Sequence, residues 1–294
     1  MTHTDVLRTL TPTQKAQLNA RSDLAGLRHL ALYLAAMGAS GAYVLSAGPL
    51  WQIAFAVYAA LLVFLFTLSH ECTHQTPFRT AALNECVGHA IAPLMCLPFV
   101  WFRYFHLAHH KHTNDPDRDP EIAGHPRPDN WRSYLIYLSG WGYWSGGLRV
   151  LWSNAFGRID APYLPERRHR EMQIEARVIL LIQCLALLSL SFSSAAFWLW
   201  ILPAVLGQPL LRLYLLAEHG LCPPVADMLE NTRTTYTNRL IRFVAWNMPY
   251  HIEHHAAPNV PFHQLPALHS VMRPHLKSTS DGYSNFTKDY IKQL

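Results

Sequence analysis

Residues 30–69 read LALYLAAMGASGAYVLSAGPLWQIAFAVYAALLVFLFTLS and contain no charged side chain. Forty residues of helix would measure about 60 Å, which is roughly two crossings of a bilayer core about 30 Å thick. Ser46, Ala47, Gly48 and Pro49 lie near the middle of the stretch, and Gly and Pro mark turns. This stretch therefore predicts a hairpin of two transmembrane helices.

A second uncharged stretch covers residues 178–211, between Arg177 and Arg212. Its turn is expected at the SFSS sequence, residues 191–194, and its second arm is expected to continue past Arg212 to about residue 217. The second stretch therefore predicts another hairpin, over about 178–217. Because a hairpin returns to the side it left, both hairpins begin and end on one face of the membrane.

The distribution of positive charge predicts the orientation of these hairpins. All 24 Lys and Arg residues lie outside the two uncharged stretches: four before the first, twelve between them and eight after the second. The positive-inside rule then places both termini and the central segment in the cytoplasm, which for a bacterial cell makes this a multi-pass protein of the inner membrane. The net charge of +5 could suit a nucleic-acid binder, but such a protein would not also carry long uncharged stretches.

The rest of the composition excludes a disordered chain and supports a cytoplasmic, reducing setting. Only 15% of the residues are charged and 50% are hydrophobic, which excludes a disordered chain. The five cysteines are odd in number and form no CxxC pair, which argues against a disulfide framework. Residues 1–29 lack the pattern of a signal peptide and predict a cytosolic arm, with a short helix capped near Thr11 or Thr13.

These observations predict an all-α membrane protein with one main domain, residues 30–294, after the N-terminal arm. The two hairpins would leave residues 70–177 and 218–294 to form a cytoplasmic cap. Two shorter apolar stretches, 86–102 and 133–148, are close to the lower length limit for crossing a bilayer. Composition alone leaves these two as crossings or as helices lying in the membrane interface.

Histidines gather in three motifs and at one further position. On a helix, residues three or four apart share a face, so each motif aims its imidazoles in one direction. Eight of the other nine histidines are expected to be ordinary surface or core residues; His112, which follows the second motif, could be a spare ligand and is left out of the set. The grouped histidines are His70 and His74 (HECTH), His106, His109 and His110 (HLAHH), His251, His254 and His255 (HIEHH), and the single His219.

Nine grouped imidazoles indicate a metal site with two ions, each with four or five ligands, since imidazole suits iron, zinc, copper and nickel. Nearby polar residues would accept the other ring N–H of a ligand; they are Glu71, Glu218, Glu253, Asp115, Asp119 and Asn247. All nine histidines must lie on one side of the membrane to meet. A crossing by either short apolar stretch would separate the motifs, so four transmembrane helices with both short stretches in the interface is the economical arrangement.

Three sequence motifs, in this order and spacing, resemble those of the integral-membrane fatty acid desaturase superfamily, which includes related hydroxylases. They are HECTH at 70–74, FHLAHHKHTNDPDRDPE at 105–121 and NMPYHIEHHAAPNVPFHQLP at 247–266. The AEHG segment at 217–220 matches the position of the additional histidine in that superfamily. The resemblance covers most of the chain from Leu30 onward.

The resemblance implies a centre of two Fe²⁺ ions held by the nine histidines, with O2 as co-substrate. It implies abstraction of hydrogen from an unactivated C–H bond of a fatty acyl chain, giving an alkene or, by hydroxylation, an alcohol. Many members carry a fused cytochrome b5 domain with an HPGG motif; that motif is absent here, so electrons are expected from a separate ferredoxin, rubredoxin or cytochrome b5 with its reductase. The expected partners are this donor, the lipid substrate and membrane lipid, and not nucleic acid.

Two other classes of function compete with this interpretation. HECTH also matches the HExxH motif of zinc proteases, with Glu71 as general base, so an intramembrane metalloprotease is one alternative. It would leave the six histidines of the other two motifs unexplained, and both uncharged stretches lack the Asp that would complete its site. A metal transporter is the other alternative, but transporters place ionisable ligands within the membrane rather than at its cytoplasmic side.

A basic segment between Arg158 and Arg170 has more than one interpretation. It contains Arg158, Arg167, Arg168 and Arg170. These side chains could bind an acidic headgroup, an acyl carrier or an electron-donor protein, or they could simply be attracted to anionic lipid.

Overall fold

The structure is a computed structural model that describes residues 1–124 and 126–294, so His125, one of the nine ungrouped histidines, lies outside the described residues. The N-terminal arm forms two short helices, α1 (His3–Arg8) and α2 (Pro12–Leu18). Thr2 and Thr11 cap them, each in a reciprocal pair of hydrogen bonds with the third residue of its helix. The short helix predicted near Thr11 is therefore present as α2.

The first uncharged stretch forms two antiparallel helices, α3 (Asp23–Ser46) and α4 (Trp51–Thr73), with a tight turn between them. The turn lies where the sequence predicts it, and Ala47 begins it in the left-handed conformation. The Tyr33 hydroxyl donates to the Leu61 carbonyl oxygen at 2.6 Å, and this bond is fully buried. Both helices extend beyond the uncharged residues, and α4 continues through the first histidine motif.

The second uncharged stretch forms α10 (His169–Ser189) and then a broken second arm. The arm consists of a π-helical turn, η2 (Phe197–Ile201), followed by α11 (Leu202–Leu206) and α12 (Gln208–His219), with a bend of 41° before α12. At the bend, a Cβ on Gly207 would lie 2.6 Å from Val63 and 3.0 Å from the Ala59 carbonyl oxygen. Close contact with α4 therefore requires glycine at this position.

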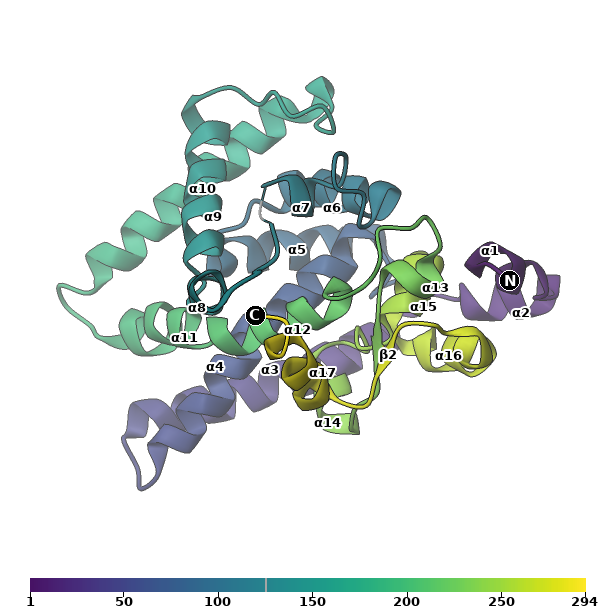
Figure 1. Cartoon of the computed structure of the whole chain (residues 1–294). Helices are drawn as coiled ribbons and strands as arrows, with labels where there is room; N and C mark the ends of the chain where they lie inside the picture. Colours follow the sequence, from purple (N-terminus) through teal and green to yellow (C-terminus); the bar gives the residue numbers. More distant parts are fainter. Residues whose placement is uncertain (125) are drawn as a thin grey trace.

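The two hairpin turns lie at the same end of the molecule, at the left of Figure 1. The Tyr58 hydroxyl of α4 donates to the Leu199 carbonyl oxygen of η2 at 2.7 Å, and the rings of Trp51 and Trp198 are 5.4 Å apart. Within the described residues, three helical segments are long and apolar enough to cross a membrane: Pro12–Ser46, Trp51–Thr73 and Glu166–Ser189. The number rises to five if each of two bent helix pairs forms one span.

The first short apolar stretch is divided between two helices, α5 (Ala81–Met95) and α6 (Phe99–His112), which meet at an angle of 98°. The Gly88 backbone packs directly against the Phe99 ring, and a Cβ on Gly88 would come within 2.3 Å of that ring. The second short stretch is divided between α8 (Trp131–Leu138) and α9 (Trp141–Phe156). The small helix α7 (Pro120–Gly124) precedes them, and η1 (Glu166–Arg168) follows.

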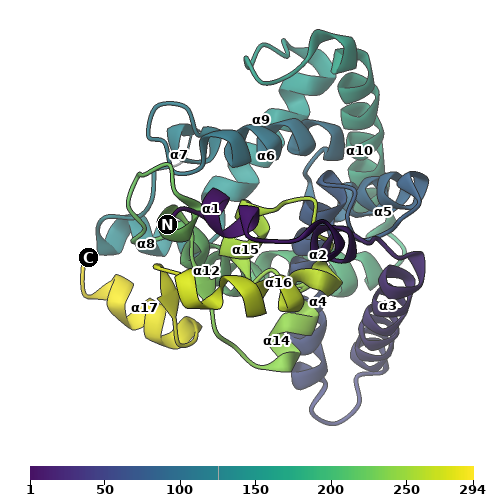
Figure 2. The ribbon, with the colours of Figure 1, turned by 90° about the vertical axis from the view of Figure 1, so that its right-hand side faces the viewer.

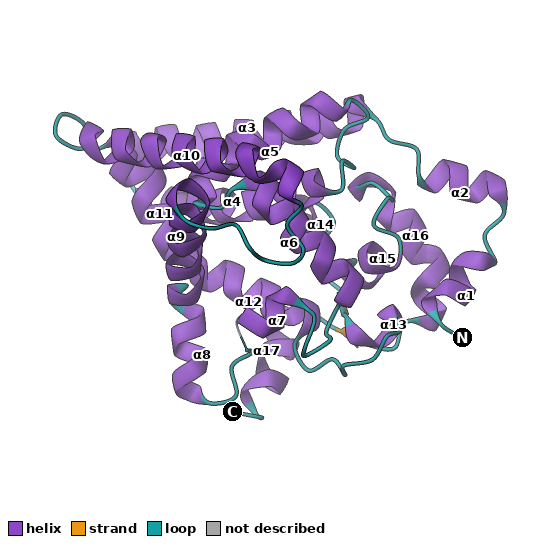
Figure 3. Cartoon of the chain, turned by 90° about the horizontal axis from the view of Figure 1, so that it is seen from above, coloured by secondary structure: helices purple, strands orange, loops and turns teal. Residues whose placement is uncertain are grey.

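The remaining elements are short and cover the end of the hairpins opposite the turns. Figure 2 looks from that end and shows α1, α15 and α16 in front of the long helices, while Figure 3 shows that helix dominates the chain. Two-residue strands β1 and β2 pair in parallel, with Thr234 opposite Thr279. The elements are α13 (Met228–Asn231), β1 (Thr234–Thr235), α14 (Arg239–Val244), α15 (His251–Ala256), η3 (Phe262–Gln264), α16 (Leu265–Met272), η4 (Arg273–His275), β2 (Thr279–Ser280) and α17 (Tyr283–Ile291).

The largest buried apolar cluster joins the hairpins to this covering layer. Tyr33, Leu62, Phe99 and Ile179 from the long helices all belong to it, as does Trp246. Trp246 is fully buried and lies five residues before the first residue of α15. The core therefore anchors the segment that carries the third histidine motif directly against α3 and α4.

Candidate metal centre

Helices α4 and α6 present the first two histidine motifs to each other. His70 lies in the last turn of α4 and His74 is the residue that ends it. His106, His109 and His110 lie in the last two turns of α6. The 98° bend between α5 and α6 turns α6 toward the end of α4, so the Nε2 atoms of His74 and His106 lie 2.9 Å apart.

Helices α12 and α15 bring in the remaining four imidazoles. His219 is the last residue of α12, and His251, His254 and His255 share the one and a half turns of α15. The Nε2 of His251 lies 3.1 Å from the Nε2 of His219. The Nε2 of His254 lies 2.9 Å from that of His70. The structure thus brings all nine grouped histidines into one site.

The ring nitrogens fall into two neighbouring groups. One nitrogen from each of five histidines lies within 4.8 Å of the others; these are His70, His74, His106, His110 and His254. A second such group holds His109, His219 and His255, and the Nε2 of His251 lies 3.1 Å from those of both His219 and His255. Two imidazole nitrogens bound at about 2.1 Å to one ion lie about 3 Å apart when they are adjacent ligands. The spacing and the division into five and four therefore fit two metal ions.

The protonation of these rings also fits a metal site. Burial, reinforced by the neighbouring imidazoles, lowers the pKa of His254 and His255 well below the usual 6.5. Both are neutral at pH 7, the form that ligates metals. Both ring nitrogens of His110 are buried and have no hydrogen-bond partner in the part of the chain that the structure describes. A buried polar atom without a partner is costly, and an ion would satisfy it.

Several of the imidazoles have a carboxylate close to their Nδ1 atom. Asp119 is fully buried, and its Oδ2 lies 2.9 Å from the Nδ1 of His109. Glu71 Oε1 lies 3.4 Å from the Nδ1 of His254, and Glu218 Oε1 lies 3.4 Å from the Nδ1 of His251. A carboxylate at the second nitrogen fixes the ring orientation and increases the basicity of the ligating nitrogen.

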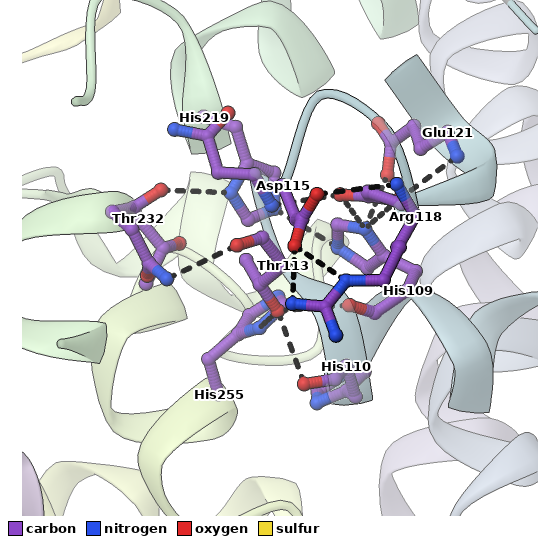
Figure 4. A network of polar contacts seen from close by, with 12 residues as sticks. His109, His110, Thr113, Asp115, Arg118, Glu121, His219, Thr232 and His255 are labelled. Atoms are coloured by element: carbon purple, nitrogen blue, oxygen red, sulfur yellow. Dashed lines mark hydrogen bonds and ion pairs between the residues drawn. The ribbon is translucent and has the colours of Figure 1, made fainter. Parts of the chain in front are cut away.

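Three further groups contact ring nitrogens and were not among the residues singled out from the sequence. The Thr113 hydroxyl lies 3.1 Å from the Nδ1 of His255, as Figure 4 shows. The Oε2 of Glu121 lies 3.2 Å from the Nδ1 of His109, and the Asn231 carbonyl oxygen lies 3.4 Å from the Nδ1 of His219. Thr113 lies four residues after His109, so its place on the same helix face was a usable signal. A backbone carbonyl carries no such signal in the sequence.

Three of the polar residues singled out from the sequence make other contacts. Asp115 forms an ion pair with Arg118 at 2.6 Å, which Figure 4 also shows. Asn247 donates to the Phe262 carbonyl oxygen at 3.0 Å. Glu253 points away from the imidazoles, because α15 turns its side chain to the opposite face from His251 and His254.

Glu253 instead connects α15 to its neighbours. Its side chain is fully buried and accepts a hydrogen bond from the Thr234 hydroxyl of β1 at 2.6 Å. Its other oxygen lies 2.5 Å from the Nδ1 of His269 on α16. Glu253 therefore holds the helix that carries three of the nine imidazoles, without contacting any of them.

Several ungrouped histidines have structural partners of their own, as expected for ordinary surface or core residues. His29 stacks on Phe243 and its Nε2 lies 2.9 Å from the carbonyl oxygen of the same residue. His89 pairs with Glu175, and His3 pairs with Asp227. These three lie apart from the two groups of ring nitrogens.

Comparison with known proteins places these features in a family context. The model of the family described as "Fatty acid desaturase" matches residues 48–287. That range begins at the turn of the first hairpin and includes all nine grouped histidines.

Individual relatives carry related names. The chain is 32% identical to sn-1 oleoyl-lipid 12-desaturase of Anabaena variabilis over 133 residues, 44% of this chain and 36% of the relative. It is 26% identical to the sphingolipid delta(4)-desaturase/C4-monooxygenase of Mus musculus over 216 residues, 69% of this chain and 59% of the relative. It is 25% identical to dihydrorhizobitoxine desaturase of Bradyrhizobium elkanii over 235 residues, 72% of this chain and 65% of the relative. The chain thus covers less than two thirds of each of these relatives.

Proposed function

This chain belongs to the fatty acid desaturase family, and we propose that it is an oxidoreductase that uses two iron ions and O2 to desaturate a fatty acyl chain. The observation that carries this proposal is the convergence of nine imidazoles into groups of five and four. Hydroxylation on the same scaffold is the second candidate. It is favoured by one relative whose name joins a desaturase and a C4-monooxygenase activity.

The donor set suits iron. Imidazole is a ligand that iron, zinc, copper and nickel all accept, and the family favours iron among these. His70, His74, His106, His110 and His254 would hold one ion. His109, His219, His251 and His255 would hold the other. With both ions bound, the site would supply O2-dependent oxidation of an unactivated C–H bond.

The chain's own residues keep the site rigid and dry. Seven of the imidazoles are less than 8% exposed and His74 is 9% exposed, so bulk water has little access to the site. Asp119 orients His109, Glu71 faces His254, and Glu218 faces His251. Such partners hold ligand rings in place before an ion binds, which reduces the reorganisation that binding requires.

We place the membrane across four helical arms: α3, α4, α10 and the broken arm from η2 to α12. The contact between Tyr58 and Leu199 near the two turns supports hairpins that lie side by side. The exclusion of Lys and Arg from residues 30–69 and 178–211 supports termini and a metal centre on the cytoplasmic side of an inner membrane. Residues 1–29 would then form the arm, and 70–177 with 218–294 the cap.

Substrate and electron donor follow from the same proposal. The substrate would be a lipid-borne or free acyl chain that reaches the site from the membrane. Electrons would come from a separate ferredoxin, rubredoxin or cytochrome b5 with its reductase.

The direct test of function is mass spectrometry of lipids and fatty acids after expression in a host with a compatible electron donor. A new species two mass units below a host acyl chain supports desaturation, and one sixteen units above supports hydroxylation. A His109→Ala variant that is expressed at the same level and shown to be folded by circular dichroism is the matched control, because it lacks one ligand. An unchanged lipid profile with several donors, in cells that hold iron-loaded protein, would contradict the proposal.

A further inference from the structure

A groove of about 580 Å³ opens at the surface between α5 and α10, separate from the histidine site. This volume lies within the usual range of ligand pockets, about 300–1,000 Å³. Its walls are mainly apolar, and its charged residues gather where α10 begins. The lining residues are His89, Pro93, Arg167, Arg170, Glu171, Ile174, Glu175, Val178, Ile179 and Ile182.

Both carboxylates of the groove already have partners. Glu171 forms an ion pair with Arg168 at 2.9 Å. Glu175, which is largely buried, lies 2.7 Å from the Nδ1 of His89. Glu175 also accepts hydrogen bonds at 2.9 Å from the backbone N–H groups of Phe99 and Val100. Both carboxylates are therefore already engaged by partners within the protein.

The two arginines of the groove, in contrast, are exposed and pair with no carboxylate among the ion pairs of the described residues. Arg167 and Arg170 thus leave an unbalanced positive charge at one end of an apolar groove. A guanidinium matches a phosphate group in charge and in hydrogen-bond geometry. The groove is complementary to a molecule with one anionic end and a long apolar body.

The position of the groove matches the boundary of a membrane. The helical segment Glu166–Ser189 is long and apolar enough to cross a bilayer, and the two arginines lie near its beginning. Farther along α10, Ile174 is 52% exposed and Val178 is 48% exposed. Apolar side chains this exposed on a spanning helix face lipid, so the groove begins at headgroup level and continues into the hydrocarbon.

We propose that this groove binds one anionic phospholipid, with its phosphate between Arg167 and Arg170 and an acyl chain along Ile174, Val178 and Ile182. The site is distinct from the histidine centre, and its occupancy does not depend on the reaction proposed there. Glu175 connects the groove to the start of α6, the helix that carries the second histidine motif. The bound lipid would therefore stabilise the elbow between α5 and α6.

Native mass spectrometry of the full chain in detergent, titrated with phosphatidylglycerol or phosphatidylcholine, tests this site. We expect one phosphatidylglycerol to bind well above the background of non-specific adducts, and phosphatidylcholine to remain at background. Replacing both arginines, Arg167→Gln with Arg170→Gln, should weaken phosphatidylglycerol binding about thirtyfold, since each removes one favourable contact with an anionic surface. Val178→Trp fills the apolar part of the groove and should weaken binding while both arginines remain.

A charge-matched control separates this site from general attraction to anionic lipid. The pair Lys15→Gln with Arg239→Gln removes two exposed positive charges elsewhere and should leave phosphatidylglycerol binding unchanged. Equal losses in the two double variants would overturn the site. Binding of phosphatidylcholine as tight as that of phosphatidylglycerol would overturn the role of charge, and displacement of the phospholipid by an equal amount of oleate would overturn its identity.

Discussion

Asp119→Asn is the substitution that most sharply tests how the protein holds its metal ligands. Asp119 is fully buried and accepts hydrogen bonds from the N–H groups of Asn114 at 2.8 Å and Glu121 at 2.9 Å. Its carboxylate also lies 2.9 Å from the Nδ1 of His109. Asparagine keeps the shape but offers one oxygen instead of two, so its amide N–H₂ must face a donor.

The expected loss can be worked from these contacts. Removing the carboxylate behind a metal-bound histidine lowers metal affinity by about 10- to 100-fold, or about 1.4–2.8 kcal/mol. His109 belongs to the group of four, so we expect about one of two irons to be lost first. The iron in the group of five should be retained longer, because none of its ligands contacts Asp119.

The assay is iron retention during titration with a chelator, followed by metal analysis of the protein. The control is Asp117→Asn, which removes an exposed carboxylate two residues away in the same loop. Helix content by circular dichroism and a single elution peak show that each variant is folded. If folded Asp119→Asn protein retained iron as well as Asp117→Asn protein, the supporting role of Asp119 would be refuted.

Three further predictions follow from other parts of the structure. His109→Ala should lower bound iron and abolish product while thermal unfolding stays cooperative, and full activity would contradict the ligand assignment. His269→Ala leaves one oxygen of the buried Glu253 carboxylate without its partner and should destabilise the fold by about 1–3 kcal/mol, seen as a lower Tm that His269→Gln largely restores; an unchanged Tm would contradict this. Burial raises the pKa of Asp227, but hydrogen bonds from His3, together with those from Lys277 and the Leu229 N–H, lower it from 3.8 to about 2. The His3 contact therefore helps to hold the N-terminal arm in place above about pH 4 and is lost as the pH falls toward 2. Hydrogen exchange in α1, corrected for its intrinsic pH dependence, should accelerate only below pH 4; acceleration already between pH 7 and 5 would contradict the assignment.

The long helices were predictable because their sequence signal is local. Residues 30–69 carry no charge and are long enough for two crossings, and Gly48 and Pro49 lie near their centre. These features are sufficient to locate α3, α4 and the turn between them. The break in the second arm was not predicted. Gly207 allows close contact with α4, and that contact exists only in the folded chain.

The residues of the histidine site could be predicted from the sequence, but their arrangement in space could not. Spacings of three and four residues identify shared helix faces, so the nine residues could be selected from the sequence. The division into five and four depends on how the ends of α4, α6 and α12 and the helix α15 meet in the folded chain. His109 therefore groups with His219 rather than with His106 and His110, its neighbours on the same helix.

The supporting polar residues were the least predictable part. Asp115 and Asp119 occur in one acidic segment, yet Asp119 faces His109 and Asp115 pairs with Arg118. The difference is four residues along a turn that follows α6, where no helical periodicity applies. Glu253 lies within the third motif but its helix face points to His269, so proximity in sequence to a ligand does not imply contact with it.

The central claim is a centre of two iron ions held by nine imidazoles, and metal analysis of the purified full chain tests it most directly. Protein expressed with ample iron, purified without chelators and measured by mass spectrometry of the metals should contain two irons per chain and little zinc. Loss of both ions should accompany substitution of histidines from the two groups together, such as His106 and His255. One zinc per chain and no iron would contradict the account and favour the metalloprotease alternative.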